Sequence, residues 1–169
     1  MDLDQRSPAA GTGRGPSGRR LPLGAGLALA LAVVAALTLV PEGSGWAWGA
    51  PGAELRWYLT GLASPATLLQ LVGNLLLLAA PAALAVRLWP GLAAAGRLAA
   101  VALATGGAIE GLQLLLPLGR VVSPVDALLN AVGAVLVGAI VAAADRTGSG
   151  PVGAPGTAAV DGATVAMYR

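Results

Sequence analysis

Four long apolar segments constrain the fold of this chain more than any other feature. They lie at about residues 21–40, 67–86, 98–116 and 125–143. Twenty residues of α-helix measure about 30 Å, which is the thickness of the hydrocarbon core of a bilayer. Because lipid offers no hydrogen-bond partners to an open backbone, segments of this length cross it as helices. The sequence therefore predicts an all-α fold, a four-helix transmembrane bundle.

The composition supports insertion into a membrane and excludes several kinds of active site. Of the 169 residues, 56% are hydrophobic and only 11% are charged, whereas soluble domains carry about 25% charged residues. The chain has no Cys and no His, so disulfides, thiol nucleophiles, the usual zinc sites and histidine proton shuttles are excluded. We expect no cofactor and no metal, and any acid–base chemistry would fall to carboxylates, Tyr or water.

Both ends of the chain differ in composition from its middle. Residues 1–20 and 145–169 are rich in small residues and Pro and lack apolar periodicity, which is typical of disorder. We predict disordered cytoplasmic tails around a transmembrane domain at residues 21–144. The first apolar segment could also belong to a signal peptide, but it is longer than the usual apolar core of about 7–15 residues.

The distribution of Arg predicts the orientation of the bundle. All ten basic residues are Arg, and only Arg56 and Arg120 flank what would be the outer ends of the apolar segments. The positive-inside rule therefore places both termini in the cytoplasm, with loop 41–66 and turn 117–124 outside. In this loop, Trp and Tyr side chains predict interface anchors, and a short helix is expected to lie on the membrane. Because the Arg residues are scattered rather than clustered, the pI of about 9.9 does not indicate a nucleic-acid partner.

Polar side chains inside the apolar segments mark the candidate functional site. Each of three segments carries a pair of polar residues three or four positions apart, which places the pair on one helical face. Ionisable groups at such positions are costly in lipid and usually face a working interior. All three pairs fall in the outer half of the predicted membrane. The residues predicted to form one pocket are Asn74, Glu110, Gln113, Arg120, Asp126 and Asn130, with Gln70 as the partner of Asn74 and Arg120 as a lid.

Structural roles remain open for the same residues. The carboxylates could be hydrogen-bonded between helices, and the amides could hold helices together. Asp126 or Ser123 could simply cap the last helix. Glu42 and Glu54 are expected to be solvated loop charges, and Gly107-x-x-x-Gly111 fits close helix packing.

The pattern Glu110-x-x-Gln113, then Arg120, then Asp126-x-x-x-Asn130-x-x-Gly133 resembles the VanZ-like family of small bacterial membrane proteins. The likeness covers about residues 68–138. The chain departs from the family pattern at Ser123, where an acidic residue is common, and after Pro81, where Gly is usual. The resemblance implies a multi-pass protein of the bacterial plasma membrane, in a family named for a member that raises resistance to the glycopeptide teicoplanin. It implies no established reaction.

Two functions remain open. The first is a non-enzymatic envelope protein whose outward pocket binds a cell-wall precursor, a lipid head group or a glycopeptide. The second is an intramembrane enzyme acting on a lipid-linked substrate, with Glu110 as general base, Asp126 as acid or cation ligand and Arg120 holding a phosphate. The absence of His and of any nucleophile motif favours the first. The expected partner is the lipid bilayer, and the sequence does not predict an oligomeric state.

Overall fold

All four apolar segments form helices in the computed structural model, which describes residues 16–148. The first is α1 (Pro16–Leu39) and the second is divided into α3 (Pro65–Leu77) and α4 (Ala79–Leu88). The third and fourth are α5 (Ala95–Leu115) and α6 (Pro124–Gly148). Within residues 16–148, four helices are thus long and apolar enough to cross a membrane, and the divided one spans Pro65–Leu88.

The predicted boundaries of the tails are partly wrong. Residues 16–20 already belong to α1, and α6 continues to Gly148. Charged residues do not end a helix, and Pro16 suits the first helical position because its missing N–H would have no partner there. The extension of α6 is held by an ion pair between Arg87 and Asp145 at 3.4 Å. The rest of both predicted tails lies outside the described residues.

The second helix is interrupted at Leu78, three residues before Pro81. Pro81 has no N–H to donate to the carbonyl of Leu77, and its ring crowds that turn. The backbone of Leu78 leaves helical geometry with φ −96° and ψ 7°, and helical bonding resumes as Ala82 N donates to Leu78 O at 2.9 Å. The predicted kink is therefore present and lies one turn before the proline.

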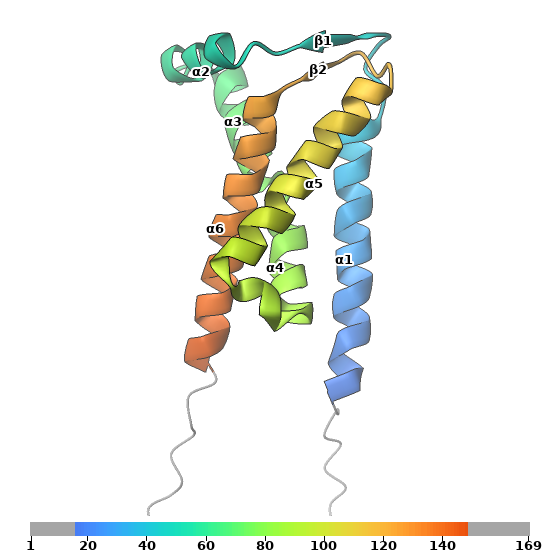
Figure 1. Ribbon diagram of the computed structural model, residues 1–169, viewed down its shortest axis with the longest axis vertical. Helices are drawn as coiled ribbons and strands as arrows, with labels where there is room; N and C mark the ends of the chain where they lie inside the picture. Colours follow the sequence, from blue (N-terminus) through green and yellow to red (C-terminus); the bar gives the residue numbers. More distant parts are fainter. Residues whose placement is uncertain (1–15, 149–169) are drawn as a thin grey trace, which may run out of the picture.

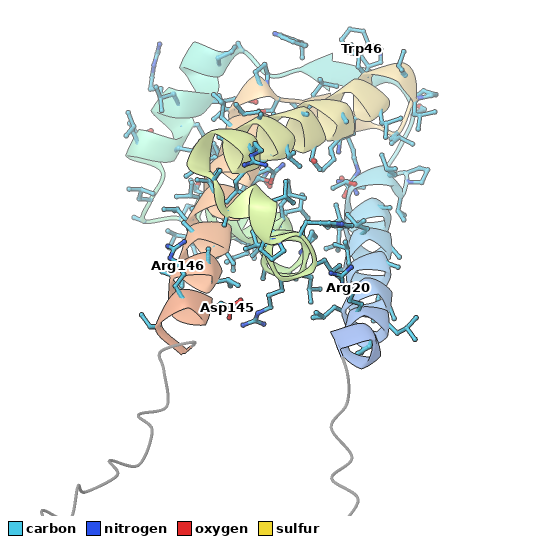
Figure 2. All side chains as sticks on the ribbon, turned by 60° about the horizontal axis from the view of Figure 1, so that its bottom comes forward. Arg20, Trp46, Asp145 and Arg146 are labelled. Carbon is cyan, nitrogen blue, oxygen red and sulfur yellow. The ribbon has the colours of Figure 1, made fainter. Side chains whose placement is uncertain are left out.

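Loops gather at one end of the bundle and both described chain ends lie at the other (Figure 1). The loop end carries α2 (Pro51–Thr60) and the strands β1 (Trp46–Trp48) and β2 (Arg120–Val122). Figure 2 shows Arg20, Asp145 and Arg146 at the end of the molecule opposite Trp46. The short helix expected in the loop is α2, but of its apolar residues Tyr58 is buried while Leu55 and Leu59 are exposed.

The prediction of an all-α fold missed a two-stranded parallel sheet. Strand β1 pairs with β2 in the register Trp46 with Arg120 and Trp48 with Val122. Flanking bonds extend the pairing, from Glu42 N to Leu118 O at 2.8 Å and from Gly49 N to Val122 O at 2.9 Å. The sheet pairs backbone groups of two loops that have no helix to satisfy them. Three-residue strands carry too little periodicity to be predicted from sequence.

Two glycines allow the loops to approach each other. Gly45 and Gly119 have positive φ angles of 78° and 71°, a region that other residues rarely adopt. A Cβ on Gly119 would lie 2.5 Å from the backbone of Gly43. Glycine is therefore required at position 119 both for backbone conformation and for space.

Helix α6 is the centre of the packing and contacts α3, α4 and α5. Small residues allow this: a Cβ on Gly133 would overlap the backbone of Leu75, and one on Gly106 would lie 2.7 Å from the carbonyl oxygen of Ala127. The predicted packing motif was wrong in register, because Gly107 and Gly111 have no atom within 4 Å of an added Cβ. The helix turns Gly106, one residue earlier, toward α6.

We expect Gly119→Ala to destabilise the protein by about 2 kcal/mol or more, because a left-handed backbone costs a non-glycine residue about 1–2 kcal/mol and the Cβ also meets Gly43. Thermal unfolding of the purified protein in detergent, followed by Trp fluorescence, measures the change. The control is Gly107→Ala, in open space on α5, which should gain about 0.5–1 kcal/mol. Equal effects of the two substitutions would contradict the assigned approach of the loops.

Candidate functional site

A polar cavity of about 580 Å³ lies between α1, α2, α3, α5 and α6. It lies beneath the loop layer, by which we mean β1, α2 and β2 with the turns that join them. All six residues predicted to share a pocket line it: Asn74, Glu110, Gln113, Arg120, Asp126 and Asn130. Gln70 lines it as well. Helical spacing brings the members of each pair to one face, and the close packing of α6 on α3 and α5 brings the three faces together. Binding of a ligand by these residues stays a prediction.

Asp126 is held by side chains from two other helices. Tyr58 on α2 donates its hydroxyl to Asp126 Oδ1 at 2.8 Å, and Gln70 on α3 donates to Oδ2 at 3.0 Å. Asn74 donates to the hydroxyl oxygen of Tyr58 at 3.4 Å. Burial and the hydrogen bond to Asp126 raise the pKa of Tyr58 above its usual range, so Tyr58 remains a donor. Asp126 therefore joins α2, α3 and α6.

Ser123 joins two of the other carboxylates that line the cavity, Glu110 and Glu54. Its backbone N–H donates to Glu110 Oε2 at 2.7 Å, and its hydroxyl donates to Glu54 Oε2 at 2.7 Å. The same hydroxyl oxygen accepts the N–H of Asp126 at 3.0 Å. Ser123 is thus the N-cap of α6. The alternative that Asp126 is the cap was wrong.

Arg120 lines the cavity but does not cover Glu110 and Asp126 as predicted. Its Nη2 pairs with Glu42 at 2.9 Å, and its Nε and Nη2 donate to the carbonyl oxygen of Val40 at 3.3 and 3.2 Å. The pairing of β2 with β1 carries Arg120 toward the end of α1, where these partners lie. The guanidinium therefore fastens the loop layer to α1.

Sequence reasoning missed two participants on α2 and misjudged one charge. Glu54 and Tyr58 both line the cavity, although Glu54 was expected to be solvated. Their contribution depends on the path by which loop 41–66 returns over the bundle, which no local pattern specifies. The i, i+4 spacing of Glu54 and Tyr58 on one helical face was the available signal.

The two buried amides of the cavity differ in their partners. Gln113, 7% exposed, donates to the carbonyl oxygen of Thr38 on α1 at 3.0 Å, so it holds two helices together. Asn130 is 2% exposed, and its Oδ1 accepts no hydrogen bond from the described part of the chain. An unsatisfied buried acceptor is costly. Asn130 is therefore the side chain most in need of an external donor.

Charge in the cavity is unbalanced. Four carboxylates line it, from Glu42, Glu54, Glu110 and Asp126, whereas Arg120 is the one basic residue among its lining residues. Pairing of Arg120 with Glu42 leaves three carboxylates without a cationic side chain. Within residues 16–148, no group of three acidic residues is arranged to hold a metal ion. The cavity offers acceptors and negative charge, in an arrangement that suits a positively charged donor.

Comparison of the chain with protein-family models, with curated proteins and with solved structures found no match. The resemblance to VanZ-like proteins therefore stays a prediction from the residues that carry it.

We expect Asn130→Leu to stabilise the purified protein in lipid-free detergent by about 1 kcal/mol, because it removes a buried acceptor whose lack of a partner costs about 1–3 kcal/mol. The matched control is Gln113→Leu, which replaces a bonded amide and should destabilise by about 1 kcal/mol. Thermal unfolding compares the two. Destabilisation of similar size in both would mean that Asn130 has a partner in the folded protein.

Proposed function

We propose that this chain is a multi-pass protein of the bacterial plasma membrane, similar to VanZ-like proteins, whose polar cavity opens outward and binds an envelope component or a glycopeptide without catalysis. One observation carries the proposal: six polar residues chosen from sequence line a single cavity of about 580 Å³. This volume lies within the roughly 300–1,000 Å³ of small-molecule sites.

Membrane insertion is supported by the outer surface of the four long helices. Large apolar side chains are exposed on each of them, including Leu29 on α1, Leu69 on α3, Leu115 on α5 and Ile140 on α6, with exposed fractions of 66–78%. Water would disfavour this much apolar surface, whereas acyl chains would cover it. Exposed Trp46 and Trp48 at the loop end suit an interface, and Arg residues at the opposite end suit the cytoplasmic side.

The enzymatic alternative is less well supported by the contacts. Both oxygens of Asp126 accept hydrogen bonds from side chains. These bonds compete with the role of acid or cation ligand that the enzymatic alternative assigns to this carboxylate. Arg120, which would hold a phosphate, is engaged by Glu42 and Val40. Binding therefore fits the cavity better than acid–base catalysis.

The orientation predicts which introduced thiols react from outside the cell. The natural chain has no Cys, so single Cys variants report one position each. A membrane-impermeant maleimide should label Gly52→Cys on α2 in intact cells and should label Thr147→Cys on α6 only after permeabilisation. The reverse pattern would place the cavity on the cytoplasmic side and overturn its outward opening.

A susceptibility assay tests the role of the cavity. Expression in a glycopeptide-susceptible host should raise the minimum inhibitory concentration of teicoplanin, and Glu110→Gln and Asp126→Asn should abolish the increase because each removes a cavity charge. Asp145→Asn, at the opposite end of α6, is the matched control and should retain it. If the natural chain behaves like the empty vector, the resistance role is wrong.

A further inference from the structure

Free acceptors inside the cavity define the chemistry of its ligand. Glu110 accepts one hydrogen bond, from Ser123 N to Oε2, which leaves Oε1 without a donor in the described chain. Asn130 also lines the cavity, and its Oδ1 is buried without a hydrogen-bond partner in the described chain. Each of these atoms requires a donor, and the carboxylate also requires positive charge. A cationic hydrogen-bond donor would satisfy both atoms.

A protonated primary amine meets both requirements. An alkylammonium group carries one positive charge and three N–H donors and has no acceptor. Hydrogen bonds between a charged donor and a carboxylate are about twice as strong as neutral ones. A ligand whose only charge is negative fits poorly, because Arg120 is already bound by Glu42 and three further carboxylates line the cavity.

An apolar groove deeper in the bundle indicates where the rest of such a ligand would lie. The groove has a volume of about 280 Å³ and is formed by α1, α4, α5 and α6. Helices that line the polar cavity also line the groove, one turn further along. On α6 the cavity is lined by Asn130 and the groove by Ala134, about 6 Å away along the helix axis. Leu77 lines the cavity and adjacent Leu78 the groove.

Polar and apolar parts in this order match an amphiphile. The polar cavity lies at the loop end, and the groove runs from the middle of the bundle to the opposite end, where Trp89, Leu92 and Leu98 line it. A lipid whose head lies at the loop end would place its acyl chain along this groove. The groove is almost entirely apolar, with Thr105 as its one hydroxyl-bearing lining residue among those described. A soluble amine would leave the groove unused.

We propose, building on the proposed function, that the cavity binds the ammonium head group of a lipid such as one with an ethanolamine head. The amine lies between Glu110 Oε1 and the side chain of Asn130, and an acyl chain occupies the groove formed by α1, α4, α5 and α6. The ligand is thus an amine-bearing membrane lipid of the outer leaflet.

Lipid-dependent thermal stabilisation of the full-length protein in detergent tests this assignment. Phosphatidylethanolamine should raise the melting temperature in a concentration-dependent way. Phosphatidylcholine has the same charges but no N–H donor, and phosphatidylglycerol lacks the cation, so neither should match it. Soluble ethanolamine at equal concentration should have little effect because it cannot use the groove.

Variants locate the binding. Glu110→Gln removes one cavity charge, and the lost charge-assisted bond should weaken the apparent affinity for phosphatidylethanolamine about tenfold or more. Asn130→Leu should weaken it too, and because this variant is expected to be more stable without lipid, weaker binding would not reflect misfolding. Asp145→Asn should bind as the natural chain does.

Each other outcome overturns the assignment in a recognisable way. Equal stabilisation by phosphatidylcholine would mean that the head-group N–H is not recognised. Equal binding of soluble ethanolamine would mean that the acyl chain is not recognised. Stronger binding of phosphatidylglycerol, lost in Glu110→Gln, would show that the cavity binds a lipid but that an amine head group is not what it recognises. If no lipid stabilises the protein, the lipid assignment is wrong, and the teicoplanin assay still tests the proposed function separately.

Discussion

The hydrogen bonds of Ser123 hold together the parts on which the rest of the structure depends. This residue is 1% exposed. Its backbone N–H donates to Glu110 on α5, and its hydroxyl donates to Glu54 on α2 and accepts the N–H of Asp126 in the first turn of α6. A single turn residue therefore fixes the angle at which α6 leaves β2. The positions of Asp126 and Asn130 follow, because both lie on the first two turns of that helix.

The helices and the list of cavity residues could be predicted because both depend on local pattern. Apolar length defines the helices, and a polar group is so costly in an apolar segment that its spacing alone shows which face turns inward. Glu110 and Asn130 were identified in this way. The partners of Arg120 could not be, because they depend on a strand pairing between segments more than 70 positions apart. Glu54 and Tyr58 were missed for the same reason: helix α2 reaches the cavity only through the fold of its loop.

Buried polar groups in this bundle fall into two kinds. Gln113 and Asp126 form hydrogen bonds within the protein. These bonds offset the free-energy cost of burying polar groups, and they also join helices. Asn130 is not satisfied, although it lies on the most tightly packed helix. A residue that serves only packing would be better replaced by an apolar one of similar size. The contrast between Gln113, which is hydrogen-bonded, and Asn130, which is not, separates side chains that hold the cavity together from the one that we expect to contact a ligand.

The parallel pairing of β1 with β2 has a consequence for how the protein is made. Strand β1 precedes α2, α3, α4 and α5 in the chain, and β2 follows them. When β1 leaves the ribosome its partner has not been synthesised, so the loop must wait with its strand unpaired until the fifth helix is complete. Contacts of such long sequence separation form late in folding. We therefore expect the wall of the polar cavity that β1, β2 and α2 form to be completed late in folding, after β2 has been synthesised.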